Sequence, residues 1–259
     1  MRLGFIIGTG MSFLAPGEEW TEIATPYGAS ITTTSAAGQP IAVLRRHGAA
    51  LNVPPHMINY KANMLALKEM GVERVVATAA VGSMRKDLAP GSLAVIQDFI
   101  DFTKHRETTI YDGPMPSVVH TDFSTPYCPE VSAAVEQAAK ELGIPLGKRV
   151  TYVCVDGPRY ETPAEIRMFA QWGGDVVGMT GVPEVVLAKE LGMCYSSVAV
   201  ISNFAAGISE RPLSHQEVVE QVSKCRGQMR SLLEGTVVLI PETRTCCQPP
   251  SGGSFVSAQ

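Results

Sequence analysis

One order of residues recurs along the chain and constrains its fold most strongly: a short apolar run ends in a turn of small or polar residues. Apolar runs of this length and β-branched content are typical of buried strands. Three runs, each with the turn that follows it, are residues 2–7 with 8–10, residues 75–80 with 81–83, and residues 194–201 with 202–207. Because open α/β sheets bind ligands at the carboxyl ends of their strands, we expect an α/β fold whose site forms from these turns.

Helical patterns separate the strand patterns, and the chain is long enough for one large domain. The expected helices span about 60–70, 129–142, 183–191 and 214–233, and a further helix begins at Pro163. With 259 residues, of which 45% are hydrophobic, the chain can bury a substantial core without a second domain. Residues 241–259 are rich in Pro, Gly and Ser and are expected to form a disordered tail.

Charge and hydropathy argue against two kinds of partner. The formal net charge is −4, so there is no overall basic field and nucleic acid is not expected as a partner. No apolar run approaches the roughly 18 residues needed to span a bilayer, so no membrane association is expected. The N-terminal MRLGFIIGTG lacks a cleavage-site pattern and is interpreted as a first strand, which favours a cytoplasmic location.

Six cysteines are scattered along the chain, with no CxxC pair and no histidine at zinc-finger spacing. They are Cys128, Cys154, Cys194, Cys225, Cys246 and Cys247. Free thiols in strand or helix patterns behave as small buried hydrophobes, so no metal site is expected. For Cys246 and Cys247, which lie in the tail, a redox role remains an alternative to having no dedicated chemistry.

The turn Gly8-Thr9-Gly10 is a candidate phosphate site, because it offers backbone N–H groups and the Thr9 hydroxyl. It also resembles the start of a dinucleotide-binding fingerprint. However, Phe13 takes the place of the third glycine and no helix pattern follows before Pro16, so NAD is not expected. A Walker A motif is absent as well.

Two further segments could hold an anion. The strand at 41–44 ends in RRHG, where Arg46 could grip an anion with two parallel N–H bonds and His47 could add another donor. Thr180 precedes a helix pattern and could supply a second hydroxyl. For the basic segment, a solvated strand edge remains the alternative interpretation.

Three side chains suit a planar polar ring such as a purine. Tyr160 offers an aromatic face, and the neighbouring Glu161 carboxylate could accept an N–H from the ring. Asn203 offers both a donor and an acceptor, as a purine edge does. Two simpler interpretations stay open: Glu161 could favour the N-terminus of the next helix electrostatically, and Asn203 could shape a turn.

Seven motifs occur along the chain in this order: IIGTG, RHG, NYKAN, GSM, GPRYET, MTGVPEVVLAKELG and SNFAAG. Together they resemble the family of trimeric purine nucleoside phosphorylases and methylthioadenosine phosphorylases, over about residues 1–236. The resemblance implies an α/β nucleoside phosphorylase domain over residues 1–240, a three-layer sandwich with a central mixed β-sheet flanked by helices. It also implies a glycosyltransferase of purine salvage, in which orthophosphate is a co-substrate and no metal or organic cofactor takes part.

The resemblance assigns a role to each candidate residue. Phosphate would be bound by Thr9, Arg46, His47, Thr180 and the backbone at Ala79 and Ala80. The nucleoside would be bound by Tyr160, Glu161, Met179, Asn203, Ala205, His215 and His120. Asn203 and His47 are the expected catalytic residues: bound phosphate places negative charge beside an oxocarbenium-like sugar, and Asn203 stabilises charge on the leaving purine.

The pocket residues favour 6-oxopurine nucleosides, although the motifs as a whole are closer to the methylthioadenosine enzymes. Those enzymes have aspartates at the positions of Asn203 and Ala205. The 6-oxopurine enzymes combine a glutamate after the aromatic residue with an asparagine at the strand end, as Glu161 and Asn203 do here. Hypoxanthine and guanine offer a protonated N1 to the carboxylate and offer O6 and N7 to the amide donor, whereas adenine presents the opposite pattern.

The sugar end of the pocket involves two histidines. His215 matches a histidine that binds the 5′-hydroxyl in nucleoside phosphorylases, although a solvated histidine in a first helical turn is the alternative. His120 lies in an irregular segment that, in the family, reaches the sugar of the neighbouring subunit. The resemblance therefore implies a homotrimer or homohexamer with active sites near subunit interfaces.

The expected activity is phosphate-dependent cleavage of inosine and guanosine to the free base and ribose 1-phosphate. A phosphorylase of methylthioinosine, or of methylthioadenosine, is the alternative within the family. A hydrolytic nucleosidase would act without phosphate, and a non-catalytic purine-binding module would lack the phosphate residues. A phosphate requirement therefore separates these classes.

Overall fold

The computed structural model describes residues 2–11, 19–35, 41–112, 119–209 and 211–247. Its strands are β1 (Arg2–Ile7), β2 (Thr21–Thr25), β3 (Gly28–Ser35), β4 (Ile41–Arg45), β5 (Val72–Ser83), β6 (Leu93–Asp101), β7 (Val150–Cys154), β8 (Val176–Gly178) and β9 (Cys194–Phe204). Its helices are α1 (Tyr60–Glu69), α2 (Pro129–Leu142), α3 (Pro163–Gln171), α4 (Gly181–Glu190), α5 (His215–Lys224) and α6 (Arg226–Leu239), with a short 3-10 turn at Pro55–Met57.

Within the described residues, the strands form one mixed sheet in the order β2-β3-β4-β1-β5-β8-β7-β6-β9. Strand β9 also pairs with β5, so β5, β8, β7, β6 and β9 close into a ring at one end of the sheet. Strands β4, β1, β5 and β9 run parallel to one another. The carboxyl ends of these four strands therefore lie at one edge of the sheet.

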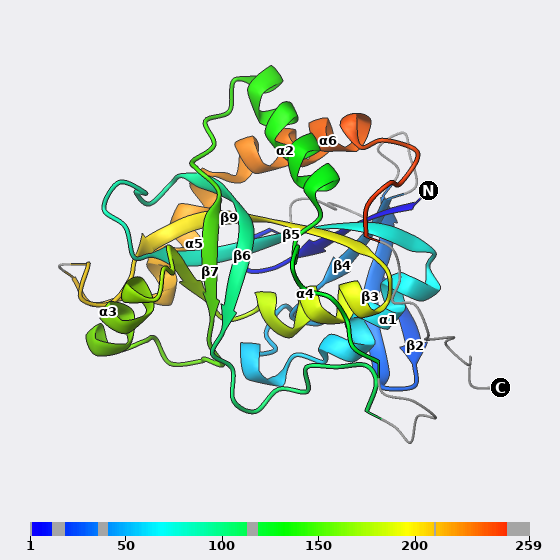
Figure 1. Cartoon of the computed structure of the whole chain (residues 1–259), viewed down its shortest axis with the longest axis horizontal. Coiled ribbons are helices and arrows are strands. Elements are labelled where there is room, and N and C mark those ends of the chain that lie inside the picture. The colour runs from blue at the N-terminus through cyan, green and yellow to red at the C-terminus, as the bar shows by residue number, and fades with distance from the viewer. Residues whose placement is uncertain (1, 12–18, 36–40, 113–118, 210, 248–259) are drawn as a thin grey trace.

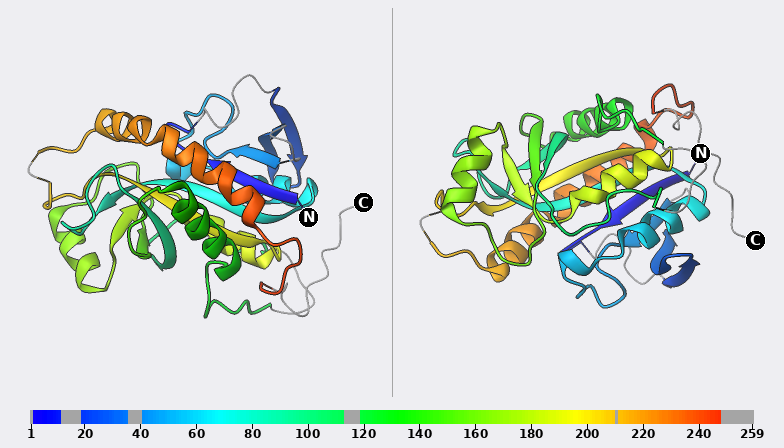
Figure 2. Two further views of the ribbon diagram at one scale, coloured as in Figure 1. Left: turned by 90° about the horizontal axis from the view of Figure 1, so that it is seen from above. Right: turned by 60° about the horizontal axis from the view of Figure 1, so that its bottom comes forward.

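Two helical layers cover the sheet, as Figures 1 and 2 show. Helices α1 and α4 contact each other and contribute to one buried apolar cluster. Helices α2, α5 and α6 contribute to a second cluster on the other face, where α2 and α6 lie side by side. A smaller cluster includes Ile166 and Phe169 of α3. The expected three-layer α/β sandwich with a central mixed sheet is confirmed.

Local sequence signals account for several helix ends. Asn59 caps α1 through its side chain, which accepts a hydrogen bond from the Ala62 N–H. Helix α2 spans the expected residues and ends at Gly143, whose φ of 64° suits a left-handed C-cap. Thr162 and Glu165 form a capping box at the start of α3, with Pro163 in the first turn as expected.

Two expected elements differ in extent. The single helix expected over about 214–233 is two helices, α5 and α6, which meet at Cys225. The strand that starts at Cys194 continues through Phe204 and does not end before Ser202, because pairing with β5 persists to that point. Asn203 is consequently a strand residue.

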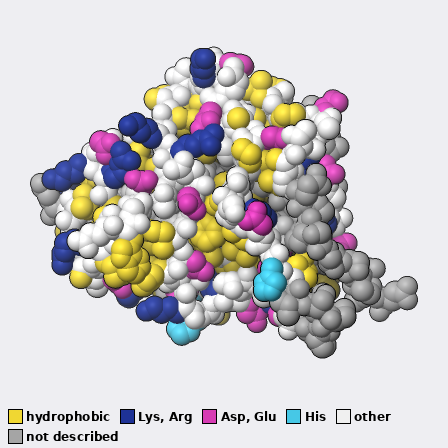
Figure 3. Space-filling model, in the orientation of Figure 1, with side chains coloured by type: hydrophobic (Ala, Val, Ile, Leu, Met, Phe, Trp, Pro, Cys, Tyr) yellow, Lys and Arg dark blue, Asp and Glu magenta, His cyan; other side chains and the backbone are white. Residues whose placement is uncertain are grey.

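The surface carries charges of both signs among apolar side chains, on the face that Figure 3 shows. Among the described residues, no helix combines the length and the apolar character needed to cross a membrane.

Candidate active site

A cavity of about 610 Å³ opens where the four parallel strands end. Loops that follow β1, β4, β7 and β8 contribute to its wall, together with residues of β5, β8 and β9 themselves and the first two turns of α5. Ten of the candidate residues line it: Thr9, Arg46, His47, Ala80, Tyr160, Glu161, Met179, Thr180, Asn203 and His215. The turns that the sequence singled out therefore meet in one place.

Three candidates lie outside the cavity wall. Ala79 is buried in the strand, next to Ala80, which does line the cavity. Ala205 is 1% exposed and packs in the small cluster beside α3, so its side chain does not face the cavity. His120 is exposed and lies in an irregular segment away from the cavity wall of its own chain. Its expected role concerns a neighbouring subunit and stays a prediction.

Asn203 reaches the cavity because of an irregularity in β9. Ile201 pairs with Val81 and Asn203 pairs with Gly82, so Ser202 is an extra residue in the ladder. A bulge of this kind re-aims the side chain that follows it. Gly82 leaves the space that this requires, because a Cβ built there would lie only 3.2 Å from Asn203 Nδ2. The asparagine thus points into the cavity from a paired strand, which excludes the simple turn interpretation.

Hydrogen bonds orient the Asn203 amide. Its Nδ2 donates to the Phe204 carbonyl oxygen at 2.9 Å, and its Oδ1 lies 2.8 Å from the Ser202 hydroxyl. A carbonyl oxygen only accepts, so the amide nitrogen must be the atom that faces Phe204. The NH₂ group has two protons, and the second remains available to a ligand. Asn203 is 5% exposed, so this donor lies in a desolvated wall.

Glu161 is a buried carboxylate, and among the described residues no cation forms a salt bridge with it. Its side chain is 8% exposed, and burial raises the pKa of its carboxyl group. Among the described residues, no other side chain donates a hydrogen bond to it. The nearby Arg159 instead pairs with Glu165 at 2.7 Å, and Glu165 caps α3. Because Glu165 fills the capping role, Glu161 is left as an acceptor facing the cavity.

Arg46 makes its two parallel N–H bonds to a protein carboxylate. Its Nε and Nη2 each lie 2.7 Å from an oxygen of Glu184, and its Nη1 donates to the Thr78 carbonyl. Burial opposes the charge on Arg46, but the Glu184 carboxylate outweighs this effect, and the pKa of Arg46 rises. The expected bidentate grip on an anion is therefore already used. Only the remaining protons on the two Nη atoms are available to a ligand in the cavity.

His47 presents a hydrogen-bond acceptor to the cavity and not the expected donor. Its Nδ1 lies 2.8 Å from the Val53 carbonyl oxygen, so Nδ1 carries the proton and Nε2 of the neutral ring is an acceptor. Burial lowers the pKa of His47, and Arg46 lowers it further, against the opposing effect of the Val53 carbonyl. Near neutral pH His47 therefore offers an acceptor to the cavity, which corrects the sequence-based expectation.

The two threonines lie at turns held by buried partners. Residues 8–11 form a turn in which the Met11 N–H donates to the Gly8 carbonyl, and Thr9 projects from its middle. At the start of α4, the N–H groups of Thr180 and Gly181 donate to the hydroxyl of Tyr152, at 3.0 and 3.2 Å. The Thr180 side chain makes no capping bond. Its hydroxyl, and not the helix N–H groups, is therefore the part that can meet a ligand.

The base and sugar candidates lie around the same cavity. Met179 and Tyr160 line it from separate loops, and His215 lines it as the first residue of α5. Arg106 fixes the Met179 loop, because its Nη2 donates to the carbonyl oxygens of Met179 and Asp156 at 2.7 and 3.0 Å. Arg106 thus links the loop after β7 to the loop after β8.

Sequence reasoning did not include Glu184, Tyr152 or Arg106, which position the cavity residues. A signal for Glu184 exists in the sequence: it is the one acidic residue of GVPEVVLA, an otherwise apolar run. A charge inside such a run is buried and needs a partner. Tyr152 and Arg106 give no comparable signal, since a tyrosine in a strand and an arginine in a loop are ordinary.

Comparisons with known proteins place this geometry in a family. The sequence matches the Phosphorylase superfamily over residues 2–237. It is 48% identical to a Dictyoglomus turgidum protein named "Probable 6-oxopurine nucleoside phosphorylase", over 95% of this chain and 94% of that one. It is 44% identical to a Methanopyrus kandleri protein named "Probable S-methyl-5'-thioinosine phosphorylase", over 95% of each chain.

The fold agrees with a solved structure of methylthioadenosine phosphorylase from Schistosoma mansoni in complex with adenine. The TM-score is 0.87 at 31% sequence identity, over 93% of this chain and 91% of that one. A family match that spans nearly the whole chain, with relatives above 40% identity, leaves one conclusion. The chain belongs to the phosphorylase superfamily.

Proposed function

We propose that the chain is a purine nucleoside phosphorylase that cleaves inosine and guanosine with orthophosphate, giving the free base and ribose 1-phosphate. One observation carries the proposal: an unpaired buried carboxylate, Glu161, and an amide donor, Asn203, line the same cavity as the anion candidates Thr9, Arg46 and Thr180. The name of the Dictyoglomus turgidum relative supports the same substrate class.

The polarity of the two base-binding groups suits a 6-oxopurine. The Glu161 carboxylate accepts from the protonated N1 of hypoxanthine or guanine, and Asn203 Nδ2 donates to N7 or O6. Adenine would bring its unprotonated N1 against the carboxylate. A buried carboxylate without a donor is costly, so adenine nucleosides are disfavoured.

In the proposed reaction, a phosphate oxygen forms a bond to the sugar C1′ while the bond from C1′ to N9 breaks, and the electron pair of that bond passes to the purine. Thr9, Thr180 and the free Nη protons of Arg46 donate to the phosphate. The neutral His47 Nε2 accepts a hydrogen bond from the phosphate hydroxyl, so that a charged phosphate oxygen is left to face the sugar. Asn203 stabilises the negative charge on the base. No metal or organic cofactor is needed for these steps.

The proposal predicts a distinct substrate profile. Initial rates are to be measured for inosine, guanosine, adenosine, methylthioinosine and methylthioadenosine, each with and without orthophosphate. We expect phosphate-dependent cleavage of inosine and guanosine, with the adenine nucleosides nearly inert. A preference for methylthioinosine, in line with the name of the Methanopyrus kandleri relative, would support the assignment of the base-binding residues. It would contradict the assignment of His215 as the residue that binds the 5′-hydroxyl. Cleavage without phosphate would instead indicate a nucleosidase.

A second prediction concerns acid pH. The kcat/KM for inosine is expected to fall as pH drops through the raised pKa of Glu161, because protonation removes the acceptor for N1–H. At neutral pH, Glu161→Gln should lower kcat/KM for inosine by about 10- to 100-fold, since a hydrogen bond to a charged group contributes about 1.5 to 3 kcal/mol.

The ratio of wild-type to variant rates across pH isolates Glu161, because His47 titrates in both proteins. The ratio should shrink at acid pH, where the wild-type carboxylate is also neutral. A ratio that stays constant with pH would show that the Glu161 carboxylate does not accept the N1–H of the substrate.

The proposal also includes a homotrimer or homohexamer in the cytoplasm, with His120 completing a neighbour's site. Sedimentation measurements and the activity of a His120→Ala variant test this part separately from the substrate profile.

A further inference from the structure

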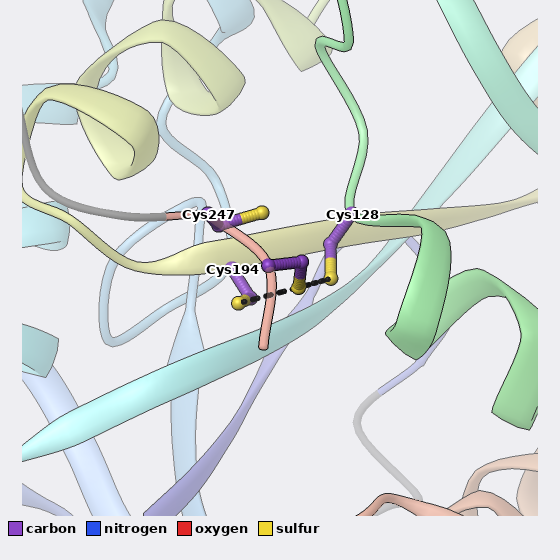
Figure 4. Close-up of side chains that lie close together, drawn as sticks. Cys128, Cys194 and Cys247 are labelled. Carbon is purple, nitrogen blue, oxygen red and sulfur yellow. Dashed lines mark hydrogen bonds between the residues drawn. The ribbon is translucent and has the colours of Figure 1, made fainter. Parts of the chain in front are cut away.

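Four of the six cysteines, distant in sequence, come together in the fold. Cys128 is the N-cap of α2, Cys194 is the first residue of β9, and Cys246 and Cys247 follow α6 in the C-terminal segment. Their sulfur atoms all lie within 4.8 Å of one another. Figure 4 shows the side chains of Cys128, Cys194 and Cys247 converging from these three segments. The sequence-based view of scattered, unrelated thiols is therefore incomplete.

We propose that these four thiols form a tetrathiolate site for one thiophilic divalent cation of the zinc type. This inference is independent of the proposed function. It replaces the expectation that the chain has no metal site.

The sulfur spacing is close to what such an ion needs. With a Zn–S distance of about 2.3 Å, a tetrahedron places its sulfurs about 3.8 Å apart. Cys246 Sγ lies 3.2 Å from Cys128 Sγ and 3.6 Å from Cys194 Sγ. The other sulfur pairs lie within 4.8 Å, so shifts of up to about 1 Å would complete the tetrahedron. A disulfide needs about 2.05 Å between two sulfurs and uses only two of them, whereas all four share one centre here.

The surroundings favour negative charge at this centre. Cys128 lies at the N-terminus of α2, where its sulfur accepts from the Val131 N–H at 3.5 Å. Binding of the ion would release the thiol protons.

A buried arginine offers a compensating charge. Arg74 is 0% exposed and pairs with Cys194 in the β5–β9 register. Its Nε and Nη2 lack a hydrogen-bond partner among the described residues, although Nη2 lies 3.7 Å from a Glu130 oxygen. Its Nη1 donates to the carbonyl of Pro241, at the start of the segment that carries the last two cysteines. Four thiolates around a divalent ion leave two negative charges, so a buried guanidinium on the neighbouring strand would offset part of that charge.

The metal site would stabilise the fold and would take no part in the reaction. Cys194 and Asn203 lie at opposite ends of β9, about 30 Å apart for nine residues of strand. The ion would join the C-terminal segment to the starts of α2 and β9. Two partly exposed ligands, Cys246 and Cys247, leave a path for the ion to enter.

Cobalt substitution tests the proposal directly. The full chain is reduced, freed of metal under anaerobic conditions and titrated with Co²⁺, whose visible spectrum reports tetrahedral thiolate coordination. We expect about one Co²⁺ per chain, with sulfur-to-metal charge transfer, displaced by Zn²⁺. Zinc should also raise the thermal unfolding midpoint, because an ion that binds only the folded state stabilises it.

Cys246→Ser and Cys247→Ser are the informative variants, since both residues lie in the terminal segment and a cooperative thermal unfolding transition would report a folded protein. Each should weaken Co²⁺ binding by more than about tenfold, because loss of a ligand exceeds loss of an outer-shell partner. Cys225→Ser is the matched control: this buried thiol lies outside the cluster and donates to the Gly91 carbonyl. It should bind Co²⁺ like the wild type.

Three results would overturn the proposal. The first is that the reduced protein binds no stoichiometric Co²⁺. The second is that Co²⁺ binding survives in both terminal variants. The third is that the protein purified in air binds no ion and its intact mass shows the loss of two hydrogens per cysteine pair. That last outcome would assign the cluster to disulfides.

Discussion

Replacing Asn203 with alanine is expected to lower kcat for inosine phosphorolysis by about 10² to 10³-fold, equivalent to about 3 to 4 kcal/mol. The lost group is a buried N–H donor that lines the cavity. In the proposed reaction this donor faces the leaving purine, and charge develops on that base only as the bond to C1′ breaks. Because the contact strengthens in the transition state, the loss should appear in kcat more than in KM. Steady-state kinetics at saturating phosphate measure both.

The leaving group provides a sharper test of the same prediction. In a nucleoside with a 7-methylated base, the base is already cationic. It therefore leaves C1′ without placing negative charge near Asn203. The variant should therefore lose much less activity on 7-methylguanosine than on guanosine. Asn52→Ala is the matched control, since Asn52 lines the same cavity but is exposed. An equal loss on both substrates would mean that the substitution disturbs the cavity and that Asn203 does not assist base departure.

The sequence allows prediction of the parts of the site that depend on local chain order. Each candidate turn follows an apolar strand, and parallel strands bring their carboxyl ends together at one edge of a sheet. This reasoning suffices to bring Thr9, Arg46 and Asn203 to one cavity before any contact is known. Thr180 follows β8, which runs antiparallel to β5, so its place in the cavity does not follow from this rule. The helix ends at Asn59 and Pro163 follow from equally local capping rules.

The parts that could not be predicted depend on partners distant in sequence. The bulge at Ser202 appears only when β9 pairs with β5. The polarity of His47 depends on the carbonyl oxygen of Val53, which a loop brings to Nδ1. The four cysteines meet because α2, β9 and the chain after α6 pack together, and no spacing rule for metal sites describes such a set.

Glu184 illustrates the same limit and leads to the largest expected effect on stability. Its carboxylate is 0% exposed, receives both parallel N–H bonds of Arg46, which lies 138 positions away, and also accepts from the Tyr195 hydroxyl at 2.6 Å. Removing one partner of a buried ion pair leaves the other charge uncompensated. We therefore expect Glu184→Gln to lower the free energy of unfolding by about 3 to 5 kcal/mol. Denaturant unfolding at a fixed protein concentration measures the change.

Glu190→Gln is a matched control on the same helix. Glu190 is also buried, but the described donors to its carboxylate are neutral, the Thr109 hydroxyl and the Ile110 N–H, so its loss should be nearer to about 1 kcal/mol. Since Glu184 also orients the guanidinium that borders the cavity, its variant should raise KM for phosphate, whereas the Glu190 variant should not. Equal destabilisation by the two substitutions would show that the ion pair with Arg46 contributes no more than an ordinary buried hydrogen bond. An unchanged phosphate KM in the Glu184 variant would show that phosphate binding does not depend on the ion pair between Glu184 and Arg46.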